Sequence, residues 1–103
     1  MRDSINAVDA FIREYGLQTD VQTRLIDLVS EIGELGKEMI VATEYGKKEL
    51  NVTKKIESEV GDCLFSLLAL CQVLDVDAAM ALDGALAKYA QRFTHKGSIS
   101  SGN

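Results

Sequence analysis

The sequence predicts an all-α protein, an antiparallel four-helix bundle-like domain that forms an oligomer. Apolar residues recur at intervals of three and four along most of the 103 residues, which is the period of amphipathic helices. The chain contains no proline and shows neither the alternation typical of strands nor a hairpin dipeptide. Capping residues and glycines divide it into four segments with short connections, as in an up-and-down bundle.

The first two helices have recognisable ends. The first is predicted to begin at Asp3 or Ser4, either of which can cap it, and to end at Gly16. The second is predicted to begin near residues 19–20 and to continue to about Tyr45. Each carries one apolar face, so each needs a neighbouring helix to cover that face.

The third helix differs from the others in its second half. Asn51 can cap this helix, which continues to about Leu74, and its segment CLFSLLALC is apolar nearly all round. Asp75 or Asp77 is predicted to cap a fourth helix with one apolar face. A helix that is apolar all round must be covered on every side. We therefore expect part of it to pack against a second copy of the chain, in a homodimer or homotetramer; the alternative is that the other three helices cover it.

The composition limits the domain organisation and the partners. We expect one helical domain over residues 1–96 and a flexible tail over 97–103, GSISSGN. The net charge of −5 argues against a nucleic-acid polymer as partner, because phosphate neutralisation requires clustered Lys and Arg. The longest apolar run, CLFSLLALCQVL, is too short to span a membrane. The charged N-terminus has no apolar signal segment, and Cys63 and Cys71 are too far apart on one helix to form a disulfide, so we expect a cytoplasmic protein.

Two short acidic motifs stand beside apolar stripes, SEIGEL in the second predicted helix and SEVGD in the third. On a helical wheel, Glu31, Glu34 and Glu38 share one narrow sector, which Asp27 joins a turn earlier. On the third helix, Glu59 and Asp62 share a sector with Ser66. Two antiparallel helices packed along these stripes would bring together, at one edge of the core, the carboxylates of Glu31, Glu34, Glu59 and Asp62. The alternative is an ordinary solvated acidic face on each helix.

Four neighbouring carboxylates raise each other's pKa values unless a cation lies among them. Ligand sets made only of oxygen atoms suit Mg²⁺, with Mn²⁺ as a substitute, and Mg²⁺ commonly shares its coordination shell with substrate phosphates. Gly33 and Gly61 lie inside the two acidic motifs, at interior helix positions where glycine is unfavourable. We expect a neighbour or a ligand to approach the backbone there.

The motifs SEIGEL and SEVGDCLF, followed by KYAQRF, resemble those of the MazG family of all-α nucleoside triphosphate pyrophosphohydrolases. The resemblance covers about residues 5–96 and implies that Mg²⁺ is bound by four acidic residues, namely Glu31, Glu34, Glu59 and Asp62. The chain departs from the family pattern at three positions. Serine replaces the leading Glu of each acidic doublet, and leucine stands where relatives often have a polar Asn; these residues are Ser30, Ser58 and Leu86.

The resemblance implies cleavage of a nucleoside triphosphate to the monophosphate and pyrophosphate, with clearance of non-canonical nucleotides as a cellular purpose. We expect Lys55, one turn before Glu59, to bind substrate and stabilise charge in the transition state. Lys88 and Arg92, with His95 on the same face, are second candidates for binding substrate. Glu38 is expected to serve as an additional ligand or as the base that activates water. The nucleobase is expected to rest on aromatic side chains of the first helix, Phe11 or Tyr15, or on a partner subunit.

Two other functions are compatible with the same residues. The chain could be a non-catalytic oligomerisation or regulatory module that kept the fold, or a pyrophosphohydrolase acting on another phosphorylated metabolite. Retention of all four acidic residues favours an enzyme over a module, because a disused site has no reason to keep mutually repelling charges.

Overall fold

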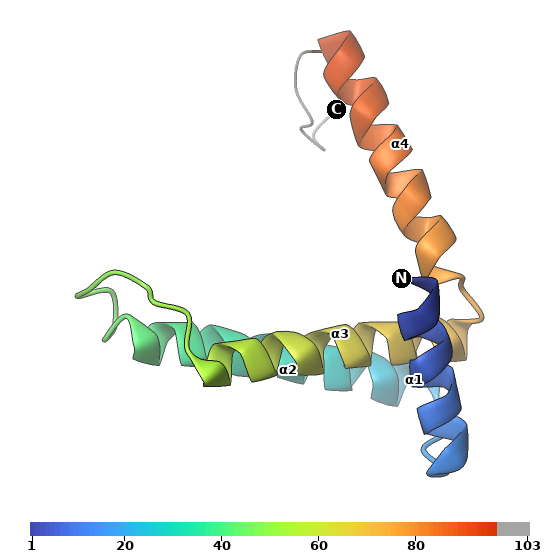
Figure 1. Ribbon diagram of the computed structural model, residues 1–103, viewed down its shortest axis with the longest axis horizontal. Helices are drawn as coiled ribbons and strands as arrows, with labels where there is room; N and C mark the ends of the chain where they lie inside the picture. The colour runs from blue at the N-terminus through green and yellow to red at the C-terminus, as the bar shows by residue number, and fades with distance from the viewer. Residues whose placement is uncertain (97–103) are drawn as a thin grey trace.

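The computed structural model describes residues 1–96 of the protein, and in this range it contains four helices and no strand (Figure 1). The all-α prediction is therefore confirmed. The predicted tail at 97–103 lies outside the described residues. The helices are α1 (Arg2–Glu14), α2 (Val21–Ala42), α3 (Lys54–Leu74) and α4 (Ala78–Lys96).

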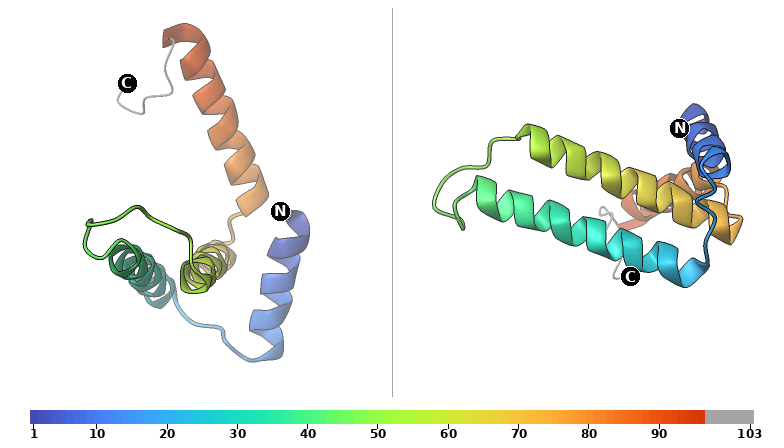
Figure 2. Two further views of the ribbon diagram at one scale, coloured as in Figure 1. Left: turned by 60° about the vertical axis from the view of Figure 1, so that its left-hand side comes forward. Right: turned by 90° about the horizontal axis from the view of Figure 1, so that it is seen from below.

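Helices α2 and α3 lie side by side and run antiparallel, and they form the most extensive contact in the chain (Figures 1 and 2). Asp20 caps α2, because its side chain accepts a hydrogen bond of 2.7 Å from the backbone N–H of Thr23. The cap of α3 is Thr53, whose hydroxyl accepts from the N–H of Ile56 at 3.1 Å. The prediction of Asn51 as this cap was wrong. The hydroxyl of Thr53, three residues before the buried Ile56, places the cap two residues later than predicted.

The connection between α2 and α3 begins earlier than predicted. Helix α2 ends at Ala42, because Glu44 and Tyr45 adopt positive φ angles of 50° and 62° and cannot continue it. Gly46 follows with a φ of 88°. Gly46 thus lies in the turn after the helix, as predicted, but the helix ends at Ala42 instead of Tyr45, three residues earlier.

Helix α1 packs across α3 rather than alongside it (Figure 2). Its first residue is Arg2, and Met1 occupies the capping position without a side-chain hydrogen bond, so neither Asp3 nor Ser4 caps it. Asp3 instead lies in the first turn, where its negative charge is favourable near the positive end of the helix dipole. The predicted stop at Gly16 is confirmed, since this residue has a φ of 64° just after the helix.

Helix α4 extends away from the α2–α3 pair (Figures 1 and 2). Asp75 takes a left-handed conformation with a φ of 57° at the end of α3, and α3 and α4 meet at 103°. Asp77 caps α4 by accepting a hydrogen bond from the N–H of Met80, and it also forms an ion pair of 2.9 Å with Arg2. The radius of gyration is 16.7 Å, larger than the ~13 Å of a compact domain of this size.

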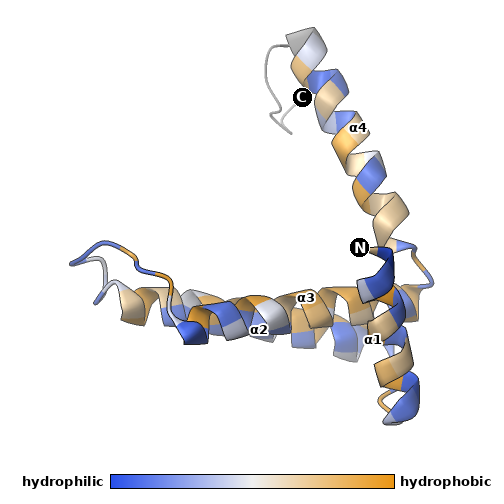
Figure 3. Cartoon of the chain, in the orientation of Figure 1, coloured by the Kyte–Doolittle hydropathy of each residue, from blue (hydrophilic) through white to orange (hydrophobic). Residues whose placement is uncertain are grey.

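The core of a single chain is small. Within the described residues, the buried hydrophobic side chains are Ile12, Ile56, Leu68 and Ala69. Apolar colour continues over exposed parts of α3 and α4 (Figure 3), and Leu64 and Leu67 of α3 remain 52% and 44% exposed. The three other helices therefore do not cover α3 on all sides.

No single helix among residues 1–96 is long and apolar enough to cross a membrane. Helices α3 and α4 together reach the length and composition of a span, but the chain bends by 103° between them.

Candidate metal centre

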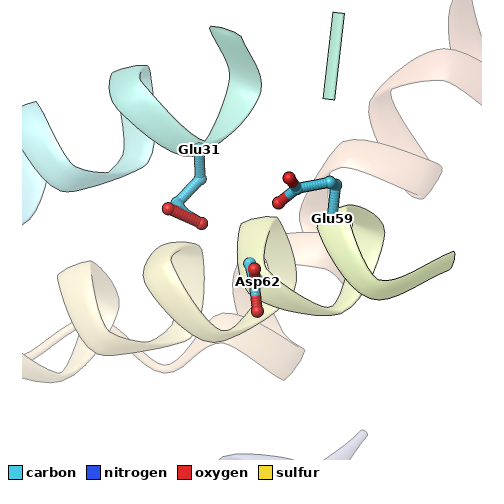
Figure 4. A group of neighbouring side chains, drawn as sticks. All are labelled: Glu31, Glu59 and Asp62. Atoms are coloured by element: carbon cyan, nitrogen blue, oxygen red, sulfur yellow. The ribbon is translucent and has the colours of Figure 1, made fainter. Parts of the chain in front are cut away.

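Three of the predicted metal ligands converge between α2 and α3. Glu31 extends from α2 toward Glu59 of α3, and Asp62 lies beside them one turn further along α3 (Figure 4). One carboxylate oxygen from each residue lies within 4.8 Å of the others. The spacing of three residues places Glu59 and Asp62 on the same face of α3, and the antiparallel packing brings Glu31 opposite them.

The surroundings of Glu59 disfavour its ionisation. Glu31 and Glu59 are half-buried, whereas Asp62 is exposed. The pKa of Glu59 is raised by partial withdrawal from water, by its hydrogen bond with Asp62, and by the negative charges of Asp62, Glu31 and Glu34. A cation among the carboxylates would relieve this repulsion.

The cysteine next to Asp62 responds to the same charges. The pKa of the half-buried Cys63 thiol is raised by withdrawal from water and then by the charges of Glu31, Glu59 and Asp62. Both Cys63 and Cys71 are free, as expected. The negative field of the cluster therefore extends to its neighbour on α3.

The donor set fits a hard divalent cation. All three converging groups are carboxylates, which are the ligands that Mg²⁺ and Mn²⁺ take in proteins. Three protein ligands leave coordination positions for water and for substrate phosphate, as Mg²⁺ requires. Asp62 is the exposed member of the three, although the apolar run CLFSLLALC follows it directly.

Two further acidic candidates lie on α2 beyond this group. Glu34 is not among the three converging carboxylates, but it is close enough for its charge to raise the pKa of Glu59. Glu38 lies one turn further along the helix and is half-buried. Lys55, the basic candidate on α3, is exposed and precedes Glu59 by one turn.

The basic candidates on α4 are not brought to the carboxylates within one chain. Lys88 and Arg92 lie over the ring of Tyr89, at 5.4 Å and 5.7 Å from its centroid. They belong to the second half of α4, which projects away from the α2–α3 pair because of the sharp bend after α3 (Figure 1). The side chain of His95 lies outside the described residues.

The glycines of the acidic motifs make no close approach within the chain. A Cβ atom added at Gly33 or Gly61 would meet nothing within 4 Å among the described residues. The expectation that a neighbouring part of the fold approaches the backbone at these glycines was wrong for the single chain. Both glycines are exposed.

Sequence reasoning missed Arg24, which is buried beside the carboxylates. It lines a pocket of about 400 Å³ together with Glu31, Asp62 and residues of both helices. The signal for it was present, because Arg24, Asp27 and Glu31 follow one another at intervals of three and four on α2. From the sequence alone, an arginine at this spacing cannot be distinguished from an arginine exposed to solvent.

Phe11, one of the two aromatic residues expected to support a nucleobase, packs against a residue that lines this pocket. The ring of Phe11 lies 4.7 Å from that of Tyr15 and 5.9 Å from that of Phe65, which lines the pocket. Tyr15 is 60% exposed.

Fold and site together define an all-α protein with a carboxylate centre between two antiparallel helices. The family model of the MazG nucleotide pyrophosphohydrolase domain matches residues 19–96, and the chain belongs to this family. The match spans both acidic motifs and helices α2, α3 and α4. Members of the family generally hydrolyse pyrophosphate bonds of nucleotides and depend on divalent metal ions.

One curated relative is an uncharacterised protein of Bacillus subtilis (strain 168), YpjD. It is 38% identical over 68 residues, which cover 63% of this chain and 60% of the relative. The match thus spans less than two thirds of that protein's length. No solved structure matches the chain with significance.

Proposed function

We propose that the protein is a Mg²⁺-dependent pyrophosphohydrolase that cleaves a nucleoside triphosphate to nucleoside monophosphate and pyrophosphate. The observation that carries this proposal is the convergence of Glu31, Glu59 and Asp62 to within 4.8 Å, in a chain of the MazG family. Mn²⁺ is expected to substitute for Mg²⁺. The alternatives, a non-catalytic helical module and an enzyme for another phosphorylated metabolite, remain as outcomes of the test below.

In this proposal, the protein side chains have distinct roles. Glu31, Glu59 and Asp62 would hold the cation, with Glu34 beside them. When bound, the cation neutralises charge on the triphosphate. Water attacks the α-phosphorus, the bond from this phosphorus to the oxygen that bridges to the β-phosphorus breaks, and pyrophosphate leaves. We assign Glu38 as the group that takes the proton from the water and Lys55 as a cation that stabilises the developing charge.

We also propose that the working form is a homodimer or homotetramer in the cytoplasm. Four large side chains on α4 form one stripe that no other described helix covers, at exposures of 37–59%: Leu82, Leu86, Tyr89 and Phe93. Monomeric proteins rarely leave such a patch open. A second copy packed on this stripe would also provide a route for Lys88 and Arg92 to reach the carboxylates of a neighbouring chain.

The reaction is tested by incubating the purified protein and Mg²⁺ with standard, deoxy and modified nucleoside triphosphates. Release of pyrophosphate rather than orthophosphate is expected, and a preference for modified nucleotides would support a role in clearing them. Glu59→Gln should lower turnover more than about 100-fold, because changes even in residues behind metal ligands cost 10- to 100-fold. Glu57→Gln is the matched control on the same helix, since Glu57 is exposed and pairs with Lys54 instead.

If the protein binds the metal but releases pyrophosphate from no member of the panel, the proposed enzyme activity is contradicted and the helical module is favoured. Turnover confined to a phosphorylated metabolite that is not a nucleotide would support the third function. A fully active Glu59→Gln protein would remove Glu59 from the metal centre.

A further inference from the structure

The carboxylate cluster opens into a pocket that the proposed reaction does not yet use. This pocket, of about 400 Å³, shares Glu31 and Asp62 with the metal centre and extends along α2 to Arg24 and Asp27. Its volume is within the range of small-molecule sites in proteins. A substrate whose phosphates lie at the carboxylates would therefore have room for a neighbouring group here.

Arg24 is the unusual residue of this pocket. It is only 8% exposed, yet its Nε–H has no hydrogen-bond partner among the described residues and no contact with solvent. Its Nη1 atom lies 3.9 Å from Oδ2 of Asp27, which is beyond hydrogen-bond distance. Buried polar groups are nearly always satisfied, so the unclosed pair between Nη1 and Asp27 leaves a donor and an acceptor open to a third group.

A purely structural role accounts for only part of this arrangement. The Nη2 atom of Arg24 donates to the backbone carbonyl of Leu17, which ties the start of α2 to the α1–α2 connection. This contact explains why Arg24 is buried. It does not account for Nη1, which lies too far from Asp27 for a hydrogen bond although both residues line the pocket.

The lining of the pocket identifies the chemistry of this third group. Three acidic residues line it against one cation, so a phosphate would meet net repulsion away from the metal. The hydroxyls of Ser30 and Ser66 can donate and accept, and the ring of Phe65 offers a flat apolar surface. Donors, acceptors and an aromatic surface together suit a neutral, flat, hydrogen-bonding group.

We propose that this pocket binds the nucleoside part of the substrate and that Arg24 and Asp27 determine which nucleoside is preferred. Arg24 donates to acceptor atoms of the nucleoside, and Asp27 accepts from its amino or hydroxyl groups. This inference rests on the proposed function, because it takes the triphosphate to lie at Glu31, Glu59 and Asp62. It adds a selectivity pair that the acidic motifs do not contain.

The test measures binding, not turnover. Calorimetric titrations in Mg²⁺ compare α,β-methylene nucleoside triphosphates, which cannot be cleaved at the α-phosphorus, with inorganic tripolyphosphate, which lacks a nucleoside. The natural protein should bind at least one nucleotide analogue more tightly than tripolyphosphate. Arg24→Gln and Asp27→Asn should each weaken binding of that analogue roughly 10- to 100-fold, the effect of losing a hydrogen bond to a charged group, and leave tripolyphosphate binding unchanged.

The control is Arg13→Gln, the same chemical change at an exposed position of α1 outside this pocket. It should leave both affinities unchanged. If Arg24→Gln fails to fold, Asp27→Asn decides, because the Asp27 side chain is 50% exposed and its replacement keeps the shape.

Three outcomes would overturn the inference. The natural protein could bind the analogues no more tightly than tripolyphosphate; the variants could weaken both ligands equally, which would assign Arg24 to the phosphates; or Asp27→Asn could change neither. Pyrophosphate release is a separate readout. A protein that binds nucleotides selectively through Arg24 but releases no pyrophosphate would contradict the proposed reaction and leave the inference intact.

Discussion

Burial and neighbouring negative charge act together on Glu59. It is half-buried between α2 and α3, and its pKa is raised first by withdrawal from water and then by Asp62, Glu31 and Glu34. The folded chain therefore holds a proton on Glu59 more tightly than the unfolded chain does. Because the folded state binds more protons, this group stabilises the fold at low pH and loses that contribution as pH rises through its raised pKa.

Glu59→Gln should therefore raise the thermal midpoint of the metal-free protein at about pH 7, where the natural carboxylate is ionised against its neighbours. The difference should shrink toward about pH 4, because both residues are then neutral. Thermal melts in a chelator across this pH range measure it, with Glu57→Gln as the control that removes a charge outside the cluster. A Glu59→Gln protein that melts below the natural one at neutral pH would show that the carboxylate is stabilising without a metal.

At the residue scale, the sequence was sufficient for three of the four predicted acidic residues and insufficient for Arg24. The positions of Glu31, Glu59 and Asp62 follow from helical spacing and from the apolar stripes beside them, and the structure brings these three together. Helical spacing does not reveal whether a side chain is buried. The same period that places Arg24 on the cluster's side of α2 would also describe a solvated cation.

At the scale of helices, periodicity predicted all four elements, and the errors lie at their ends. The start of α3 shifts from Asn51 to Thr53, and α2 stops at Ala42. Both Asn51 and Thr53 are good capping residues, so the choice between them depends on where Ile56 is buried. The antiparallel α2–α3 pair, which positions the carboxylates, does not depend on these ends.

The exposed stripe of α4 leads to a prediction about assembly. Leu86 is 58% exposed on the stripe that also carries Leu82 and Phe93, so we expect the natural protein to sediment as more than one chain. Leu86→Glu should shift it toward the monomer by placing a charge in the contact. Ala87→Glu adds the same charge on a different face of α4 and should leave the assembly unchanged. Sedimentation velocity over a range of concentrations measures this, and a natural protein that is monomeric throughout would contradict the proposed assembly.

At the scale of the whole molecule, the direction of α4 could not be predicted from the chain. The bend of 103° depends on the left-handed conformation of Asp75 and on the ion pair between Arg2 and Asp77, which joins α1 to the start of α4. No local pattern specifies that pair. With α4 extended, few apolar side chains are buried in one chain, and the α2–α3 pair with its carboxylates is the best-packed part of the fold.

We propose that these two helices hold a divalent cation between Glu31, Glu59 and Asp62. The most direct test is a calorimetric titration of Mn²⁺ into the metal-free protein, repeated with Glu59→Gln and with Glu57→Gln. We expect the natural protein and Glu57→Gln to bind the ion with equal affinity and Glu59→Gln to bind it far more weakly. Equal binding by all three proteins, or no binding by the natural one, would contradict it.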